Sequence, residues 1–148
     1  MQERLPVEDV VHLTQAVRRA YHRFRHLSDQ LHGDLGITGP KRALLLLLAE
    51  NGPMTVPALA GERFVSRQII QTQINQLLSA KLVEAQENPH HKRSQLIALS
   101  EGGEQMIQSM MQREHGYINQ LSEVPSLEAI RTTCDVLDYL YTDLKDPE

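Results

Sequence analysis

The sequence predicts a mainly α-helical fold with one small β hairpin, and three patterns carry this prediction. Residues 55–81 hold two short helical patterns separated by only a few residues. Residues 81–100 then show two short stretches of alternating character around a polar turn. Long amphipathic patterns with apolar residues spaced by threes and fours lie toward both ends of the chain. With 148 residues, 41% of them hydrophobic and 23% charged, we expect one globular domain over residues 1–148.

The first long helix is expected over residues 7–35, ended by Gly33 and Gly36. Its apolar residues recur at a spacing suited to another helix, and they are Val10, Val17, Tyr21, Phe24 and Leu31. Its arginines are Arg18, Arg19, Arg23 and Arg25, which form either a solvated face or a phosphate-contacting one. A second helix, capped by Thr38 and stopped at residues 51–53, carries an unbroken leucine run that predicts deep burial.

A helix-turn-helix is predicted next. Thr55 caps a short helix that has Pro57 in its first turn, and residues 63–65 form a brief connection. Ser66 then caps a longer helix over residues 66–81. Its apolar stripe consists of Ile70, Ile74, Leu77 and Leu78. In such a pair the first helix supports the second, which is the one that enters a DNA groove.

The other face of this longer helix has the composition of a DNA-recognition surface. It carries Arg67, Gln68, Gln71, Thr72 and Asn75, and the helix contains no acidic residue. Arginine can pair with guanine through two hydrogen bonds, and glutamine or asparagine can do the same with adenine. We therefore predict base and phosphate contacts from these five residues. Ser66 is expected both to cap the helix and to contact a phosphate.

The hairpin that follows is predicted to be a wing. Two strand patterns, KLVEAQ and SQLIALS, flank the polar turn ENPHHKR. Lys92 and Arg93 at its tip are placed to contact the DNA backbone or a narrow minor groove, which attracts arginine. The predicted fold class is thus mainly α with a small β wing: a winged helix-turn-helix at residues 38–100, flanked by long dimerisation helices at residues 5–36 and 100–145.

The C-terminal helices carry more apolar surface than this small lobe can cover. Ser100 caps one helix, and Pro125-Ser126 begins the last one. Apolar residues of the last helix are spaced alternately by three and four: Leu127, Ile130, Cys134, Leu137, Tyr141 and Leu144. We infer a homodimer whose contacts include Val10, Val17, Leu127, Ile130, Leu137, Tyr141 and Leu144. A two-fold dimer would hold two recognition helices about one duplex turn, ~34 Å, apart on a pseudo-palindrome.

Two stretches resemble the MarR family of bacterial transcriptional regulators. VSRQIIQTQINQLLSAKLVE is similar to that family's recognition helix and first wing strand, and NPHHKRSQLIALSEGG to its wing and next helix. Three positions depart from the family pattern: Phe64 replaces a turn glycine, Ile69 a small polar residue and His91 a wing aspartate. At Ile69 a thymine methyl contact becomes possible. The resemblance implies a dimeric repressor that a small ligand, bound between the dimerisation helices and the winged helix, releases from its operator.

The net charge of −4 is unevenly distributed, and this matters for DNA binding. Residues 1–60 carry 7 basic and 6 acidic groups, and residues 61–100 carry 5 and 3. Residues 101–148 carry 3 basic and 10 acidic groups, a net charge of −7. The excess acid lies outside the proposed binding surface, and only nearby charge decides contact with phosphates. Double-stranded DNA therefore remains the predicted partner, with binding that weakens as the salt concentration rises. The alternative is a dimeric protein-interaction module whose winged helix no longer binds DNA.

Other classes of function find little support in the sequence. No GxSxG, Walker or HExxH motif is present, so we expect neither an enzyme nor a cofactor. His22 and His26, with His12 and His32, have spacing that zinc can use, but a structural role is favoured and no metal is predicted. Cys134 is expected in a buried stripe rather than as an oxidant sensor. Met106, Met110 and Met111 are either core residues or the lining of a ligand pocket. No membrane span or export signal is recognisable, and we expect a cytoplasmic protein.

Overall fold

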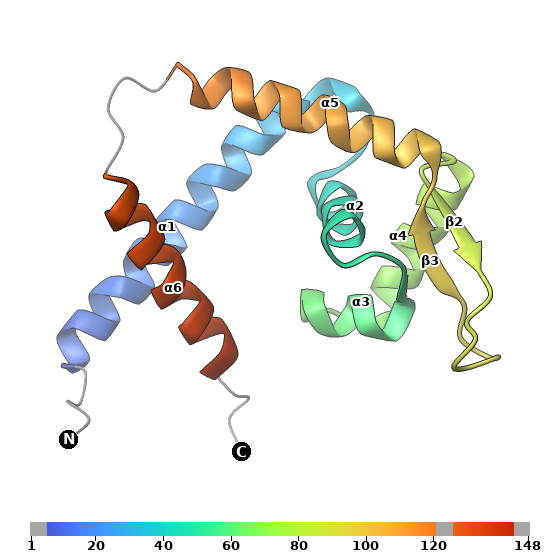
Figure 1. The fold of residues 1–148 in the computed structure, drawn as a ribbon, viewed down its shortest axis with the longest axis horizontal. Coiled ribbons are helices and arrows are strands. Elements are labelled where there is room, and N and C mark those ends of the chain that lie inside the picture. The colour runs from blue at the N-terminus through green and yellow to red at the C-terminus, as the bar shows by residue number, and fades with distance from the viewer. Residues whose placement is uncertain (1–5, 121–125, 144–148) are drawn as a thin grey trace. The chain divides into compact units, whose positions relative to one another are not determined.

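The computed structural model describes residues 6–120 and 126–143. Its elements follow in the order shown in Figure 1. They are α1 (Val7–His32), the 3₁₀ turn η1 (Gly33–Leu35), α2 (Gly39–Asn51), β1 (Met54–Thr55), α3 (Val56–Arg63), α4 (Arg67–Ser79), β2 (Val83–Gln86), β3 (Leu96–Leu99), α5 (Glu101–Ile118) and α6 (Leu127–Asp143). The chain divides into two compact units, Met1–Glu114 and His115–Glu148. The predicted division into a DNA-binding lobe and a dimerisation lobe stays a prediction.

The small sheet has the strand order β1-β3-β2, and both pairings are antiparallel. Strands β2 and β3 are the predicted hairpin, with Val83 opposite Leu99. Strand β1 was not predicted from the sequence. It has only two residues, and its pairing of Met54 with Ile97 joins segments far apart in the chain, so no local pattern announces it.

The core lies between α2, α3, α4, α5 and the sheet. From α2 it contains Leu44, Leu45 and Leu48, which confirms the expected burial for these three leucines, whereas Leu46 and Leu47 are only partly buried. The apolar stripe of α4 supplies three further buried residues, Ile70, Ile74 and Leu77. Because this stripe is fixed in the core, the opposite face of α4 is held toward solvent at a defined angle.

Side-chain caps set most helix starts as predicted. The amide of Ala58 donates to Thr55 Oγ1 at 3.3 Å, and that of Ile69 donates to Ser66 Oγ at 3.3 Å. The amide of Gly103 donates to Ser100 Oγ at 3.1 Å. The prediction for Thr38 was wrong in one respect: it occupies the N-cap of α2, but its side chain makes no capping hydrogen bond. Pro40 in the first turn lacks an N–H, which leaves fewer donors for a cap to satisfy.

Two polar contacts fasten α5 to the end of α1. The Arg113 guanidinium forms a two-pronged ion pair with Asp34 and donates to the Leu31 carbonyl at 2.8 Å. Next to it, His32 Nε2 lies 3.0 Å from a Glu114 carboxylate oxygen, and the imidazole is fully buried. Helix α1 therefore ends at His32, and residues 33–35 continue as the 3₁₀ turn rather than as the predicted helix.

The apolar stripe of α6 is exposed, and no residue of this helix is buried. The thiol of Cys134 is exposed, so the expectation that it is buried was wrong for the single chain. Leu137 on the same helix is 38% exposed. On α1, Val17 is 40% exposed while Val10 is half-buried. The predicted contact residue Leu144, like Pro125, lies outside the described residues.

Candidate nucleic-acid interface

The turn between α3 and α4 sets the direction in which α4 leaves the core. Phe64 follows the last residue of α3 with a left-handed backbone, φ 51°, and its side chain is 76% exposed. The amide of the next residue, Val65, donates to the carbonyl of Ala60 and closes the turn. Such a conformation is ordinarily filled by glycine, because a Cβ is strained there. Phe64, which departs from the family's usual turn glycine, is therefore a bulky residue in a backbone conformation that favours glycine.

Helix α4 and the wing enclose a groove of about 770 Å³. Six of the eight predicted DNA-binding residues line it: Arg67, Gln68, Gln71 and Asn75 from α4, and Lys92 and Arg93 from the wing. The positive charges of this lining come from Arg67, Lys92 and Arg93, and no carboxylate lines the groove. A concave surface with positive charge and amide groups, and without acids, suits a phosphate backbone and base edges.

The other two predicted residues, Ser66 and Thr72, lie on α4 but do not line this groove. The Ser66 hydroxyl accepts the hydrogen bond from Ile69 that caps the helix. The Thr72 hydroxyl donates to the carbonyl of Gln68 at 3.0 Å, one turn earlier in the helix. Both hydroxyls are thus engaged with the backbone, and both side chains remain exposed.

The wing tip owes its shape to Asn88. The amide of His90 donates to Asn88 Oδ1 at 3.0 Å, and the amide of His91 donates to the Asn88 carbonyl at 3.2 Å. Lys92 and Arg93 follow this turn with exposed side chains. Within the described residues neither of them forms an ion pair, so their charges are available to an anion from outside the chain.

Comparisons with known proteins agree with this geometry. Residues 35–94 match the model of the MarR family. An uncharacterised protein of Mycobacterium tuberculosis is 32% identical over 68% of this chain and 71% of its own length. The chain belongs to the MarR family. Its structure resembles that of a MarR family transcription regulator with a TM-score of 0.74 and 25% identity, covering 92% of each chain. It also resembles a mutant MarR of E. coli complexed with operator DNA, with a TM-score of 0.71 and 19% identity, covering 93% of this chain and 99% of the other.

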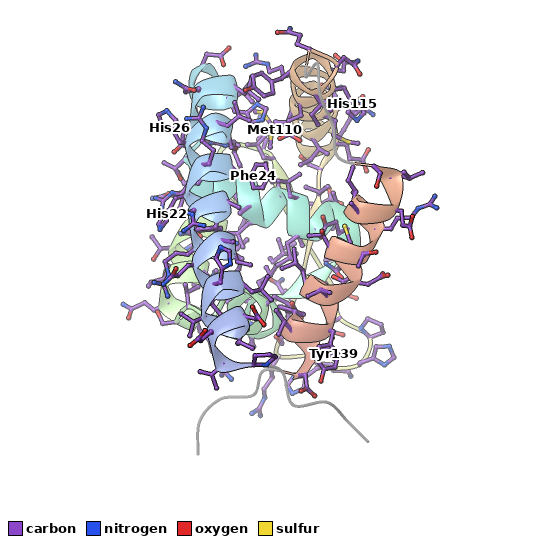
Figure 2. All side chains as sticks on the ribbon, turned by 90° about the vertical axis from the view of Figure 1, so that its left-hand side faces the viewer. His22, Phe24, His26, Met110, His115 and Tyr139 are labelled. Carbon is purple, nitrogen blue, oxygen red and sulfur yellow. The ribbon has the colours of Figure 1, made fainter. Side chains whose placement is uncertain are left out.

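Membership of the MarR family makes this chain a DNA-binding transcriptional regulator and not an enzyme. In the described residues no group of three or more histidine, cysteine or acidic side chains is arranged to hold a metal ion. Figure 2 shows His22 and His26 on one side of α1, while Phe24 points to the side where α2 lies. None of the helices in the described ranges has the length and apolar content needed to cross a membrane.

Sequence reasoning missed several groove residues of this MarR-family chain. Val56 and Pro57 line it from the start of α3, and Ser94 and Gln95 from the approach to β3. The first two reach the groove because β1 pairs with β3, a contact that the sequence did not predict. Gln95 was open to prediction, because it lies only two residues after Arg93 in the hairpin.

A second groove, of about 400 Å³, lies between α1 and α2. Its lining includes two aromatic rings and three guanidinium groups, from Tyr21, Phe24, Arg25, Arg42 and Arg63. Arg42 is only 4% exposed; it pairs with Asp29 and donates to the Ile37 carbonyl at 2.9 Å. The methionines do not contribute to either groove: Met110 is buried in the core, Met106 packs against it and Met111 is exposed.

Proposed function

We propose that this protein is a homodimeric repressor that binds a pseudo-palindromic operator and is released from it by a small ligand. The observation that carries the proposal is the acid-free groove between α4 and the wing, with Arg67 at one side and Lys92 and Arg93 at the other. Because its target is chromosomal DNA, the proposed place of action is the cytoplasm. The proposed lobes are residues 38–100 for DNA and residues 5–36 and 100–145 for dimerisation.

The proposed contacts follow from the chemistry of each side chain. Arg67 pairs with guanine, and Gln68, Gln71 and Asn75 meet base edges in the major groove. Ser66 and Thr72, at the helix start and on its exposed face, meet phosphate or sugar. Lys92 and Arg93 anchor the wing on the backbone or in the minor groove. Exposed Ile69, at 49%, is placed to meet a thymine methyl group.

Dimerisation is supported by apolar side chains that the single chain leaves in water. On α6, Leu127 and Tyr141 are each 61% exposed and Ile130 is 40% exposed. Together with Val10 and Val17 of α1, they form apolar stripes on two long helices. A second copy is the simplest cover for such stripes, and closed two-fold dimers are the commonest oligomers.

The α1–α2 groove is the proposed site of the releasing ligand. Tyr21 and Phe24 offer apolar contact, while Arg25 and Arg63 offer positive charge, so an organic anion fits this lining. The groove joins the long helix α1 to the DNA-binding lobe through α2 and α3. A ligand that binds better to one spacing of the two DNA-binding lobes would shift the dimer toward that spacing and out of register with the duplex.

Selection of bound sequences from a randomised duplex pool, at low and at moderate salt, tests the proposal. We expect an enriched inverted repeat whose half-sites lie about one helical turn, ~34 Å, apart. Recovery of no motif at either salt would refute it. That result would favour a protein-interaction module instead, a function to which the net charge of −7 over residues 101–148 is better suited.

A further inference from the structure

Two of the groove side chains are joined to each other. Gln71 Nε2 donates to Asn75 Oδ1 at 2.9 Å, across one turn of α4. Both side chains are exposed and both line the groove between α4 and the wing. By contrast, the amide of Gln68 forms no hydrogen bond among the described side chains. Of the groove amides on α4, those of Gln71 and Asn75 are therefore hydrogen-bonded to each other before any ligand arrives.

We propose that Asn75 is a positioning residue that fixes the Gln71 amide so that Gln71 recognises adenine. The inference rests on the proposed DNA-binding function. A primary amide has two N–H hydrogens, one on the side of its own oxygen and one on the far side. Recognition of adenine uses the oxygen, which accepts from N6–H, and the hydrogen beside it, which donates to N7. The far hydrogen takes no part in that contact and is free to bond Asn75.

The same hydrogen bond limits what Asn75 can do itself. Its oxygen already accepts from Gln71 and keeps one lone pair, so a two-bond contact of Asn75 with adenine would have to share that oxygen between two donors. Its Nδ2 group keeps hydrogens to donate, which suits an acceptor such as guanine O6 or N7, thymine O4 or a phosphate. The pair is thus expected to impose adenine opposite Gln71 and to favour an acceptor opposite Asn75.

The operator obtained from the selected pool provides the test, through a panel of duplexes that carry each base at each position. The variant Gln71→Ala identifies the base pair that Gln71 contacts. At that position of the operator, the preference for one base over the other three should fall by roughly 5-fold to 150-fold. Asn75→Leu keeps the side-chain size and removes the acceptor. We expect it to lower the adenine preference at that same base pair by about tenfold.

Two further variants separate positioning from bulk effects. Asn75→Asp retains an acceptor for the Gln71 amide but adds negative charge, so it should weaken binding to every duplex while keeping the adenine preference. Gln76→Leu alters a neighbouring exposed residue of α4 that does not line the groove, and it should leave all preferences unchanged. All variants are full-length, and their folded state is checked by circular dichroism.

The outcomes distinguish this inference from the function on which it rests. An operator on which Asn75→Leu keeps the full adenine preference would overturn the inference alone. A base other than adenine at the Gln71 position would do the same. A wild-type chain that selects no motif would overturn the proposed function, and the inference with it.

Discussion

Phe64 carries a local conformational cost that can be removed. Its left-handed backbone strains any residue with a Cβ, and its ring is mostly in water, so little packing offsets the cost. We predict that Phe64→Gly raises the free energy of unfolding by about 0.5–1 kcal/mol, measured by urea denaturation. Val65→Gly, one residue later and without a positive φ, should lower it instead. Equal losses from both variants would show that the Phe64 ring is needed for stability.

Gly103 is a residue whose missing side chain is structural. A Cβ built there would lie 2.1 Å from the carbonyl oxygen of Leu82, so α5 could not keep its approach to the end of α4. We predict that Gly103→Ala lowers the free energy of unfolding by roughly 1–3 kcal/mol. Gly116 on the same helix has no described atom within 4 Å of such a Cβ, and Gly116→Ala should raise stability by up to ~1 kcal/mol. Thermal unfolding of the two variants compares them directly.

At the residue scale, much of the candidate site could be predicted from the sequence. Helical spacing placed Arg67, Gln68, Gln71 and Asn75 on one side of α4, and the hairpin pattern placed Lys92 and Arg93 across from them. What a linear pattern does not contain is which polar groups bond each other. The hydrogen bonds of Gln71 with Asn75 and of Thr72 with the backbone depend on the rotamers that each side chain adopts.

At the element scale, the ion pair of Arg113 with Asp34 is one of the two polar contacts that fasten α5 to the end of α1. The hydrogen bond from Arg113 holds the pKa of Asp34 below its ordinary value of 3.8. A lowered pKa means that the pair stabilises the folded state above pH 3.8, and that this stabilisation is lost as the pH falls through the folded-state pKa. We predict that Asp34→Asn is less stable than wild type at pH 7, and that the difference disappears in strong acid.

Urea unfolding at a series of pH values measures this difference. Glu87→Gln is the matched control, because Glu87 is exposed and forms no ion pair with the described residues. It should show no comparable loss at neutral pH. A deficit in Asp34→Asn that persists unchanged in strong acid would mean that the asparagine disturbs the fold in some way other than loss of the charge pair.

The existence of the helices and most of their N-caps could be predicted from the sequence, because both depend on residues that are neighbours in the chain. The prediction was weaker where an element depends on distant partners. Strand β1 exists through its pairing with β3, and α1 gives way to a 3₁₀ turn where Arg113 and Glu114 contact its end. The burial of Arg42 had no signal in the sequence either, since it follows from the packing of α2 against Asp29 of α1.

At the scale of the whole molecule, we expect the apolar stripe of α6 to form part of the dimer interface. A charged side chain introduced there should then weaken the dimer. Leu137→Glu should leave the single chain folded, because Leu137 is outside the core. In a two-fold dimer it would bury two unpaired carboxylates, and we expect the dimer dissociation constant to rise roughly 100-fold. Sedimentation equilibrium measures this constant.

Thr132→Glu is the matched control, because it adds the same charge on the opposite face of α6 and should leave the dimer intact. Equal effects of the two variants would exclude the stripe as the interface.

The measurement that tests the central claim most directly is the affinity for the selected operator as salt concentration is varied. Two double variants remove equal charge: Arg67→Ala with Arg93→Ala in the groove, and Arg19→Ala with Arg23→Ala on the exposed side of α1. The groove variant should lose about 100-fold or more in affinity, and its salt dependence should be shallower by one to two phosphate contacts. The α1 variant should bind within about threefold of wild type. The reverse pattern would place the DNA on α1 and contradict the groove as the DNA-binding surface.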